Sequence, residues 1–212
     1  ILDGMLEHTR VCRDAGVSYY GYLEPREGDG AGLLEALASR AALVVTDTFP
    51  TFFLPRMVAS AARKLAVRLD EVDSNGILPL RAGGRVFTTA ASFRRHLQKT
   101  LTPHLLAMPM KDPLAARSVK ACASVDESIA QRWPRLTEDT SVDLSGLAIA
   151  HGIGPTAFRG GSRAGLMRLD DFLERRLGRY HTDRNGIDDG AASGLSAYLH
   201  FGFVSSHTCV RE

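Results

Sequence analysis

Hydrophobic and polar positions in the first part of the chain alternate between helical and strand-like spacing. Three segments carry apolar side chains at helical intervals, residues 1–15, 32–42 and 52–65. Three short apolar runs typical of strands occupy residues 17–24, 42–47 and 67–73. Because strands separated by helices form βαβ units, the pattern predicts a Rossmann-like parallel sheet covered by helices.

The pattern changes after about residue 92. Residues 92–106 predict an amphipathic basic helix, and a segment rich in Pro, Ser, Thr and Gly follows up to about residue 165. A second strong helix is predicted over residues 166–180, with one apolar face formed by Leu166, Leu169, Leu173, Leu177 and Tyr180. We therefore predict an α/β N-terminal domain (1–90), an interdomain helix and connector (91–150), and the beginning of an all-helical domain (151–212).

Composition narrows this picture only slightly. The 212 residues are 44% hydrophobic and 24% charged, as in an ordinary globular protein. A net charge of +2 permits an anionic partner but does not require one. Three widely separated cysteines indicate reduced thiols of an intracellular protein, and no apolar run is long enough for a membrane span, so we expect a soluble chain. We also expect a monomer. The chain starts at Ile1 within a helical pattern and stops within another, so we expect a fragment.

Three candidate sites are weak. The glycine-rich segment 27–37 has Leu33 where a dinucleotide-binding loop needs its third glycine, which favours a simple loop. Asp73, Ser74 and Asn75 follow a predicted strand and are equally suited to a turn or to ligand binding. Two helices carry basic clusters, for which a solvated face is favoured over phosphate binding: Arg94, Arg95 and Lys99, and Arg175, Arg176 and Arg179. No HExxH or GxSxG motif supports a metal site or hydrolysis.

The C-terminal segment 180–202 combines small, hydroxyl and aromatic residues. Tyr180 ends the predicted helix, and a polar loop with Arg184 and Asn185 follows. Ser193 and Ser196 flank the start of another helix, for which Ser196 is the predicted N-cap. Serine hydroxyls and free N–H groups at a helix start can bind an anion. On spacing alone a capped helix after a turn is the favoured interpretation.

The same segment resembles a known signature. Tyr180, the "RN" pair at 184–185 and "SGLSAYLHFG" at 193–202 resemble the flavin-binding signature of the cryptochrome/photolyase family. The "YLHFG" form is closest to class II-type cyclobutane pyrimidine dimer photolyases. Three upstream segments are similar in order and character to the N-terminal α/β domain of that family, "VVTDTFPTFFLPRM", "VDSNGILPLR" and "FRRHLQ".

The resemblance implies a helical domain that binds FAD. It assigns the FAD phosphates to Tyr180, Ser193, Gly194, Leu195 and Ser196, with Arg184 and Asn185 matching the loop motif. Ala192 stands where relatives often have threonine, which implies one hydroxyl contact fewer, and Ala197 replaces a frequent proline. His200 matches the histidine of the motif, for which we expect a structural role.

The implied activity is light-dependent DNA repair, in which reduced FAD transfers an electron to a cyclobutane pyrimidine dimer flipped out of DNA. Such an enzyme is a carbon–carbon lyase with damaged DNA as its partner, no metal and no membrane, in the cytoplasm. The electron-relay residues are expected beyond Glu212, since Trp133 is the one tryptophan here, so we expect the fragment itself to be inactive. No residue pattern indicates an antenna chromophore. Two alternatives stay open: a cryptochrome-like photoreceptor and a cofactor-free interaction protein.

Overall fold

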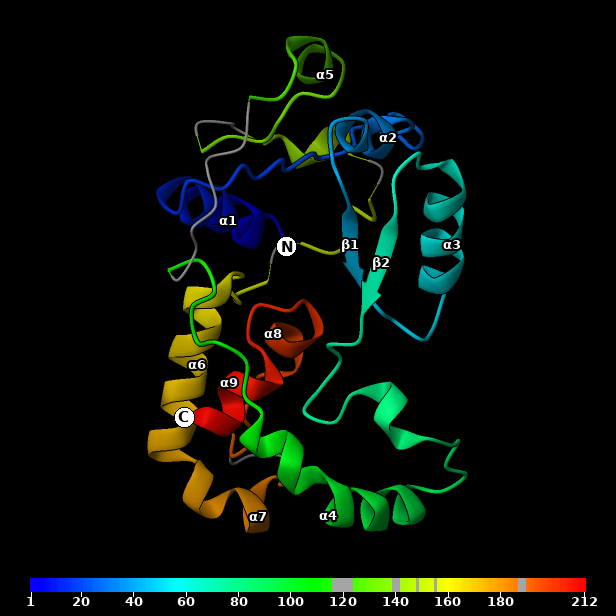
Figure 1. The fold of residues 1–212 in the computed structure, drawn as a ribbon. Coiled ribbons are helices and arrows are strands. Elements are labelled where there is room, and N and C mark those ends of the chain that lie inside the picture. Colours follow the sequence, from blue (N-terminus) through cyan, green and yellow to red (C-terminus); the bar gives the residue numbers. More distant parts are fainter. Residues whose placement is uncertain (116–123, 139–141, 148, 155, 187–189) are drawn as a thin grey trace. The chain divides into compact units, whose positions relative to one another are not determined.

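Figure 1 shows the computed structural model, which describes residues 1–212 except 116–123, 139–141, 148, 155 and 187–189. The chain divides into two compact units. Unit 1 contains Ile1–Pro25, Asp112–Ala123 and Arg135–Glu212, and unit 2 contains Arg26–Lys111 and Ser124–Pro134. The domain boundaries expected near residues 90 and 150 stay a prediction. No helix in the described part of the chain is long and apolar enough to cross a membrane.

A βαβ unit lies in unit 2. Strands β1 (Val44–Asp47) and β2 (Leu69–Val72) pair in parallel with Val44 opposite Leu69, and helix α3 (Leu54–Lys64) connects them beside the sheet (Figure 1). Leu54, Val58 and Leu65 on the predicted apolar side of α3 are half-buried. The parallel pair and its helical crossover are confirmed, and they are compatible with an α/β domain.

Four further elements complete unit 2: α2 (Leu33–Ala38), the 3-10 helix η1 (Leu80–Gly83), α4 (Ala90–Leu106) and α5 (Glu127–Arg132). Helix α2 packs against α5, and Ala38, Ile129 and Trp133 are buried. The indole N–H of Trp133 donates to the carbonyl of Asp29 at 2.8 Å, which fixes the glycine-rich loop in front of α2.

The strand predicted at residues 17–24 is wrong. Among the described residues this segment forms one isolated antiparallel bridge, between Tyr22 and Arg135, and the N–H of Leu136 donates to the carbonyl of Gly21 at 2.7 Å. Its pairing partner is too short and irregular to extend a ladder, and the aromatic side chains serve local packing instead: Tyr19 meets the ring of His8 edge-on at 5.8 Å. Strand propensity reflects such packing as much as backbone preference.

Unit 1 is helical. Its described elements are α1 (Leu2–Asp14), the 3-10 helix η2 (Leu144–Gly146), α6 (Ser162–Arg175), the 3-10 helix η3 (Leu177–Arg179), α7 (Tyr180–Asp183), α8 (Ser196–His200) and α9 (Ser206–Arg211). The core cluster of this unit consists of Leu169, Leu195, Tyr198 and Val204, with Leu169 only 1% exposed.

The helix predicted over residues 166–180 differs in extent and in its buried face. Helix α6 begins at Ser162 and ends at Arg175, and its buried residues are Gly165, Leu169 and Phe172. Leu166 and Leu177, predicted on the apolar face, are 41% and 50% exposed. The face is rotated because Gly165 lets Tyr198 and Val204 approach closely, so the core forms around that glycine rather than around Leu166.

Candidate functional site

Helix α6 is the scaffold of the C-terminal site, and its first turn is fixed by acidic side chains of α1. Gly161 precedes α6 with φ of 95°, and no N-cap side chain is present. Instead, Glu7 accepts a hydrogen bond from the N–H of Arg163 at 3.0 Å, and Asp3 accepts one from the N–H of Gly160 at 3.0 Å. One free donor of the helix start, the N–H of Arg163, is thus satisfied from another segment of the chain, and the residue before the N-cap is held in the same way.

The α8 segment is anchored on α6 by close packing. A Cβ on Gly165 would lie 2.5 Å from Cγ2 of Val204 and 3.0 Å from Cδ1 of Tyr198, so only glycine permits this approach. The hydroxyl of Tyr198 donates to the carbonyl of Arg159 at 2.9 Å. These contacts place the turn that precedes α8 next to the charged side of α6.

Two arginines hold that turn. Nε of Arg168 donates to the carbonyl of Ser193 at 2.9 Å, and Nη1 of Arg176 donates to the carbonyl of Gly190 at 3.0 Å. Gly194 has φ of 68°, and a Cβ there would lie 2.5 Å from Nε of Arg168. Position 194 therefore requires glycine for two reasons, its backbone conformation and the close approach of the Arg168 guanidinium.

Asp171 orients these arginines. Its Oδ2 atom lies 2.7 Å from Nη2 of Arg176 and 3.3 Å from Nη1 of Arg168, while Oδ1 lies 3.6 Å from Nη1 of Arg175. The side chains of Arg168, Asp171 and Arg176 are only 22–28% exposed, so water screens them less than ordinary surface charges. One carboxylate between three guanidinium groups leaves an excess of positive charge beside the turn.

The turn itself offers further donors. The N–H groups of Ser196 and Ala197 find no acceptor among the residues that the structure describes, and the Ser196 side chain is exposed. The Oγ atom of Ser193 accepts from the N–H of Leu195 at 3.4 Å, and its own hydroxyl hydrogen stays available. Hydroxyls, N–H groups and guanidinium groups are the set that binds phosphate.

The structure corrects the roles of two residues in this turn. Ser196, the predicted N-cap of α8, is its first helical residue, and the preceding Leu195 makes no side-chain capping bond. The side-chain oxygen that supports the turn belongs to Ser193 instead. The side chain of Leu195 is 4% exposed and packs in the core, so only its main chain can contact a ligand.

Tyr180 and Arg184 form a second group. Tyr180 begins α7 rather than ending the preceding helix, because the chain passes through η3 first. Its ring packs edge-on against Phe172 of α6 with centroids 5.3 Å apart, and Cζ of Arg184 lies 5.7 Å from the ring centroid. Asn185 is exposed, and the next residues, 187–189, lie outside the described part. Among the residues that the structure describes, no hydrogen bond or ion pair joins this group to the Ser193 turn, but both groups pack on α6.

The sequence does not identify two residues of the site, Arg168 and Asp171. The sequence places the basic cluster of this helix on Arg175, Arg176 and Arg179 and favours a solvated face for it. The available signal is the i, i+3 spacing of Arg168 and Asp171 on either side of the buried Leu169. The matched His200 is exposed, and its ring meets Phe201 edge-on at 4.7 Å.

The two weaker loop candidates have structural partners. Asp73 accepts hydrogen bonds from the N–H groups of Leu80 at 2.9 Å and Arg81 at 2.8 Å, and the amide of Asn75 donates to the carbonyl of Thr48. These bonds favour the turn interpretation of residues 72–80. In the glycine-rich loop, a Cβ on Gly32 would meet the Trp133 ring at 3.5 Å. No group of three or more potential metal ligands occurs among the described residues.

Comparison with known proteins gives a consistent result. No family model matches the chain. It is 29% identical to the deoxyribodipyrimidine photo-lyase of Arabidopsis thaliana over 81% of the chain, and 26% identical to that of Methanothermobacter thermautotrophicus over 97%. The protein of the same name from Oryza sativa is 27% identical over 69% of the chain. The chain spans 28–42% of the length of these relatives. The chain is therefore similar, over most of its length, to proteins named deoxyribodipyrimidine photo-lyase from three organisms.

Proposed function

We propose that the chain forms the phosphate-binding part of an FAD site in a protein that repairs DNA in a light-dependent reaction. The observation that carries the proposal is the similarity, over 69–97% of the chain, to proteins of three organisms that share the name deoxyribodipyrimidine photo-lyase. Because the chain covers less than half of each relative, the activity is proposed for the complete gene product that contains it.

The chemistry of the turn fits the diphosphate of FAD. Ser193 and Ser196 supply hydroxyl donors, and the N–H groups of Ser196 and Ala197 are free to donate within the described structure. Gly194 leaves no Cβ between the main chain and the guanidinium of Arg168. A diphosphate is stabilised by such donors together with an excess of positive charge.

The residues of the site have distinct tasks in this proposal. The serines and the main chain of residues 194–197 bind phosphate oxygens. Arg168 and Arg176 keep the turn in its binding conformation and add positive charge, while Asp171 orients both guanidinium groups. Tyr180, whose ring packs edge-on against Phe172 of α6, and Arg184, which lies over the Tyr180 ring, bind the cofactor from the loop side, with Asn185 beside them. When bound, FAD supplies the light-driven electron transfer to the lesion.

The proposed substrate is DNA that contains a cyclobutane pyrimidine dimer, and the proposed reaction class is carbon–carbon lyase. A dimer pairs poorly with the opposite strand, so extruding it from the helix costs less than extruding an intact base. Such an enzyme needs binding, orientation and electron transfer from its protein, and no acid–base machinery.

The test uses the complete gene product, purified in the dark. Flavin released on denaturation, together with blue-light-dependent conversion of a dimer-containing oligonucleotide to intact thymines, is the expected result. Bound flavin without repair would favour a photoreceptor, and a colourless protein would favour an interaction protein of the same fold. Replacing both Ser193 and Ser196 by alanine is expected to lower the flavin content. Replacing the exposed pair Thr51 and Ser128 of unit 2 by alanine should leave it unchanged.

A further inference from the structure

A second site lies in unit 2, in a segment with an extreme charge composition. Residues 74–111 contain no Asp or Glu, although the whole chain carries 24 acidic residues and a net charge of only +2. The same segment contains six cations, Arg81, Arg85, Arg94, Arg95, Lys99 and Lys111. Such a one-sided segment creates a local positive potential that attracts anions.

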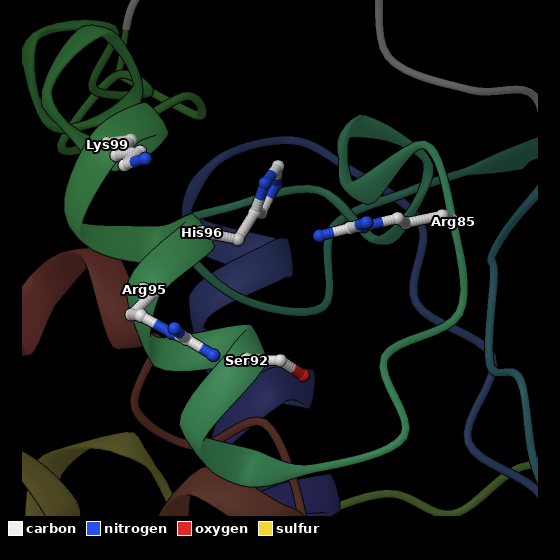
Figure 2. A pocket seen from close by; sticks show the side chains of 5 residues that line it. All are labelled: Arg85, Ser92, Arg95, His96 and Lys99. Atoms are coloured by element: carbon white, nitrogen blue, oxygen red, sulfur yellow. The ribbon is translucent and has the colours of Figure 1, made fainter.

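A pocket of about 340 Å³ collects part of this charge. It is lined by Arg85, Ser92, Arg95, His96 and Lys99. The last four positions recur at i, i+3, i+4 and i+7, so they share one face of α4. Figure 2 shows Arg85 extending from the loop before α4 toward this face. The pocket therefore combines side chains of two separate segments.

An aromatic residue and a helix cap position these groups. Cζ of Arg85 lies 4.9 Å from the ring centroid of Phe87, and the same ring lies 4.8 Å from that of His96. Phe87 thus supports the loop arginine and the helix histidine together. Thr89 caps α4 by accepting from the N–H of Ser92 at 3.2 Å, while the Ser92 hydroxyl donates to the carbonyl of Thr89 at 2.8 Å. Ser92 is thereby occupied, and the nitrogen-bearing side chains are the donors.

The nitrogen atoms that line this pocket have no hydrogen-bond or ion-pair partner among the described residues. Within the described structure, Arg85, Arg95 and Lys99 take part in no ion pair or side-chain hydrogen bond. The Nε2 atom of His96 is buried, and no hydrogen-bond partner is found for it in the described part of the chain. Native structures rarely leave a buried polar atom unsatisfied, so this atom indicates an acceptor supplied from outside.

We propose that this pocket binds a phosphate group. Three permanent cations around one cavity exceed what a single carboxylate can neutralise, whereas phosphate offers several oxygens to separate donors. Arg85 and Arg95 contact two of its oxygens, Lys99 adds a third cationic donor, and His96 donates from Nε2 after a small rotation of its ring. The site is separate from the turn at residues 193–196, which lies in the other unit, and does not depend on the proposed function.

The same phosphate chemistry has two sources, a free phosphorylated small molecule and the backbone of a nucleic acid. The test titrates the whole 212-residue chain with inorganic phosphate, with ADP and with a short fluorescein-labelled single-stranded DNA. A nucleic-acid source predicts that DNA binds more tightly than ADP and that its affinity falls steeply with salt. A small-molecule source predicts saturable binding of ADP or phosphate that the DNA does not compete for.

Matched double variants separate the pocket from general charge. Arg95→Gln with Lys99→Gln removes two pocket cations and is expected to weaken binding by about tenfold or more. Arg81→Gln with Arg94→Gln removes two cations of the same segment that do not line the pocket, and is expected to weaken binding by about threefold or less. All four side chains are exposed, so circular dichroism should show both proteins folded.

Two results would overturn the proposal. One is the absence of binding of all three probes at low salt, and the other is an equal loss of affinity in the two double variants. A direct readout adds a third criterion, the ring ¹⁵N resonances of His96. They are expected to shift on phosphate addition in the wild-type protein and to stay unchanged in the pocket variant. A wild-type titration without any His96 shift also counts against the site.

Discussion

The Nε atom of Arg168 donates a hydrogen bond to the main-chain carbonyl of Ser193, 2.9 Å away. This bond connects the middle of α6 to the turn that carries the family signature, across 25 residues of sequence. The guanidinium is held from the other side by Asp171, so its position depends on α6 and its effect is exerted on the turn. The conformation of the proposed phosphate site therefore depends on a residue outside the signature.

Arg168→Leu is expected to destabilise unit 1. It removes a partly buried hydrogen bond to the Ser193 carbonyl and leaves that carbonyl without its donor, which costs about 1–3 kcal/mol. Urea denaturation followed by circular dichroism measures the change. Arg163→Leu is the matched control, because this exposed arginine lies on the same helix and uses only its main chain in a hydrogen bond. Equal losses in the two variants would show that Arg168 has no special role.

Gly194→Ala should be more damaging than Gly190→Ala. Both glycines have positive φ, 68° and 54°, so both substitutions carry a backbone penalty of about 1–2 kcal/mol. Only the Cβ at position 194 displaces the Arg168 guanidinium, whereas position 190 has open space. The additional loss at position 194 is expected to be about 1–2 kcal/mol.

A double-mutant cycle checks this explanation. In the Arg168→Leu background the guanidinium is already absent, so Gly194→Ala should cost little more than the backbone penalty. Strict additivity of the two substitutions in thermal or urea unfolding would contradict the contact.

Gly165→Ala is expected to lower the free energy of unfolding by about 1–3 kcal/mol, because the new Cβ overlaps Val204 and Tyr198, both of which are buried. Gly178→Ala provides the comparison, since nothing lies within 4 Å of its Cβ position and its φ is not positive. That variant should be neutral or stabilised by up to about 1 kcal/mol. A loss at Gly178 equal to that at Gly165 would refute the close approach of α6 to the α8 segment.

The stability of the chain should decrease at alkaline pH through Cys209. Burial against the core cluster raises the pKa of the Cys209 thiol, while its own main-chain hydrogen bond acts in the opposite direction. A raised pKa in the folded state means that the contribution is complete below the pKa of the unfolded thiol. The contribution is lost as pH rises through the folded value.

Urea unfolding at neutral pH and at about pH 10 tests this in wild type and in Cys209→Ala. The wild-type protein should lose more stability between the two pH values than the variant. The cavity left by the substitution affects both pH values alike and therefore drops out of the comparison. Identical pH dependence in both proteins would remove Cys209 as a cause.

Local patterns predicted the parts of the fold that depend on local contacts. Strands β1 and β2 are apolar runs, and α3 has apolar residues at helical spacing, so each can be recognised from a few neighbouring residues. Their parallel pairing follows from the helical crossover between them. The start of α6 could not be predicted in the same way. The N–H groups of Gly160 and Arg163 at this point are bound by Asp3 and Glu7, which are 157 and 156 residues away in sequence.

The candidate site also combines residues that the local sequence reveals with residues that only distant contacts reveal. Ser193, Gly194 and Ser196 are recognisable because the signature is contiguous. The role of Arg168 becomes visible only in the folded structure, where it donates to the Ser193 carbonyl of the turn. The buried face of α6 likewise depends on the contact between Gly165 and Val204. A pattern of apolar positions cannot reveal that a glycine, rather than a leucine, lies at the centre of a contact.

The bond between Asp3 and Gly160 also sets an order of events during synthesis. At about 5–20 residues per second, α1 leaves the ribosome roughly 8–30 s before its partner at position 160 is made. All of unit 2 is synthesised in that interval, since it occupies residues between the first and last segments of unit 1. The nascent chain therefore carries the unpaired amphipathic helix α1 while the βαβ unit forms, and chaperones that bind such helices have their longest opportunity at α1.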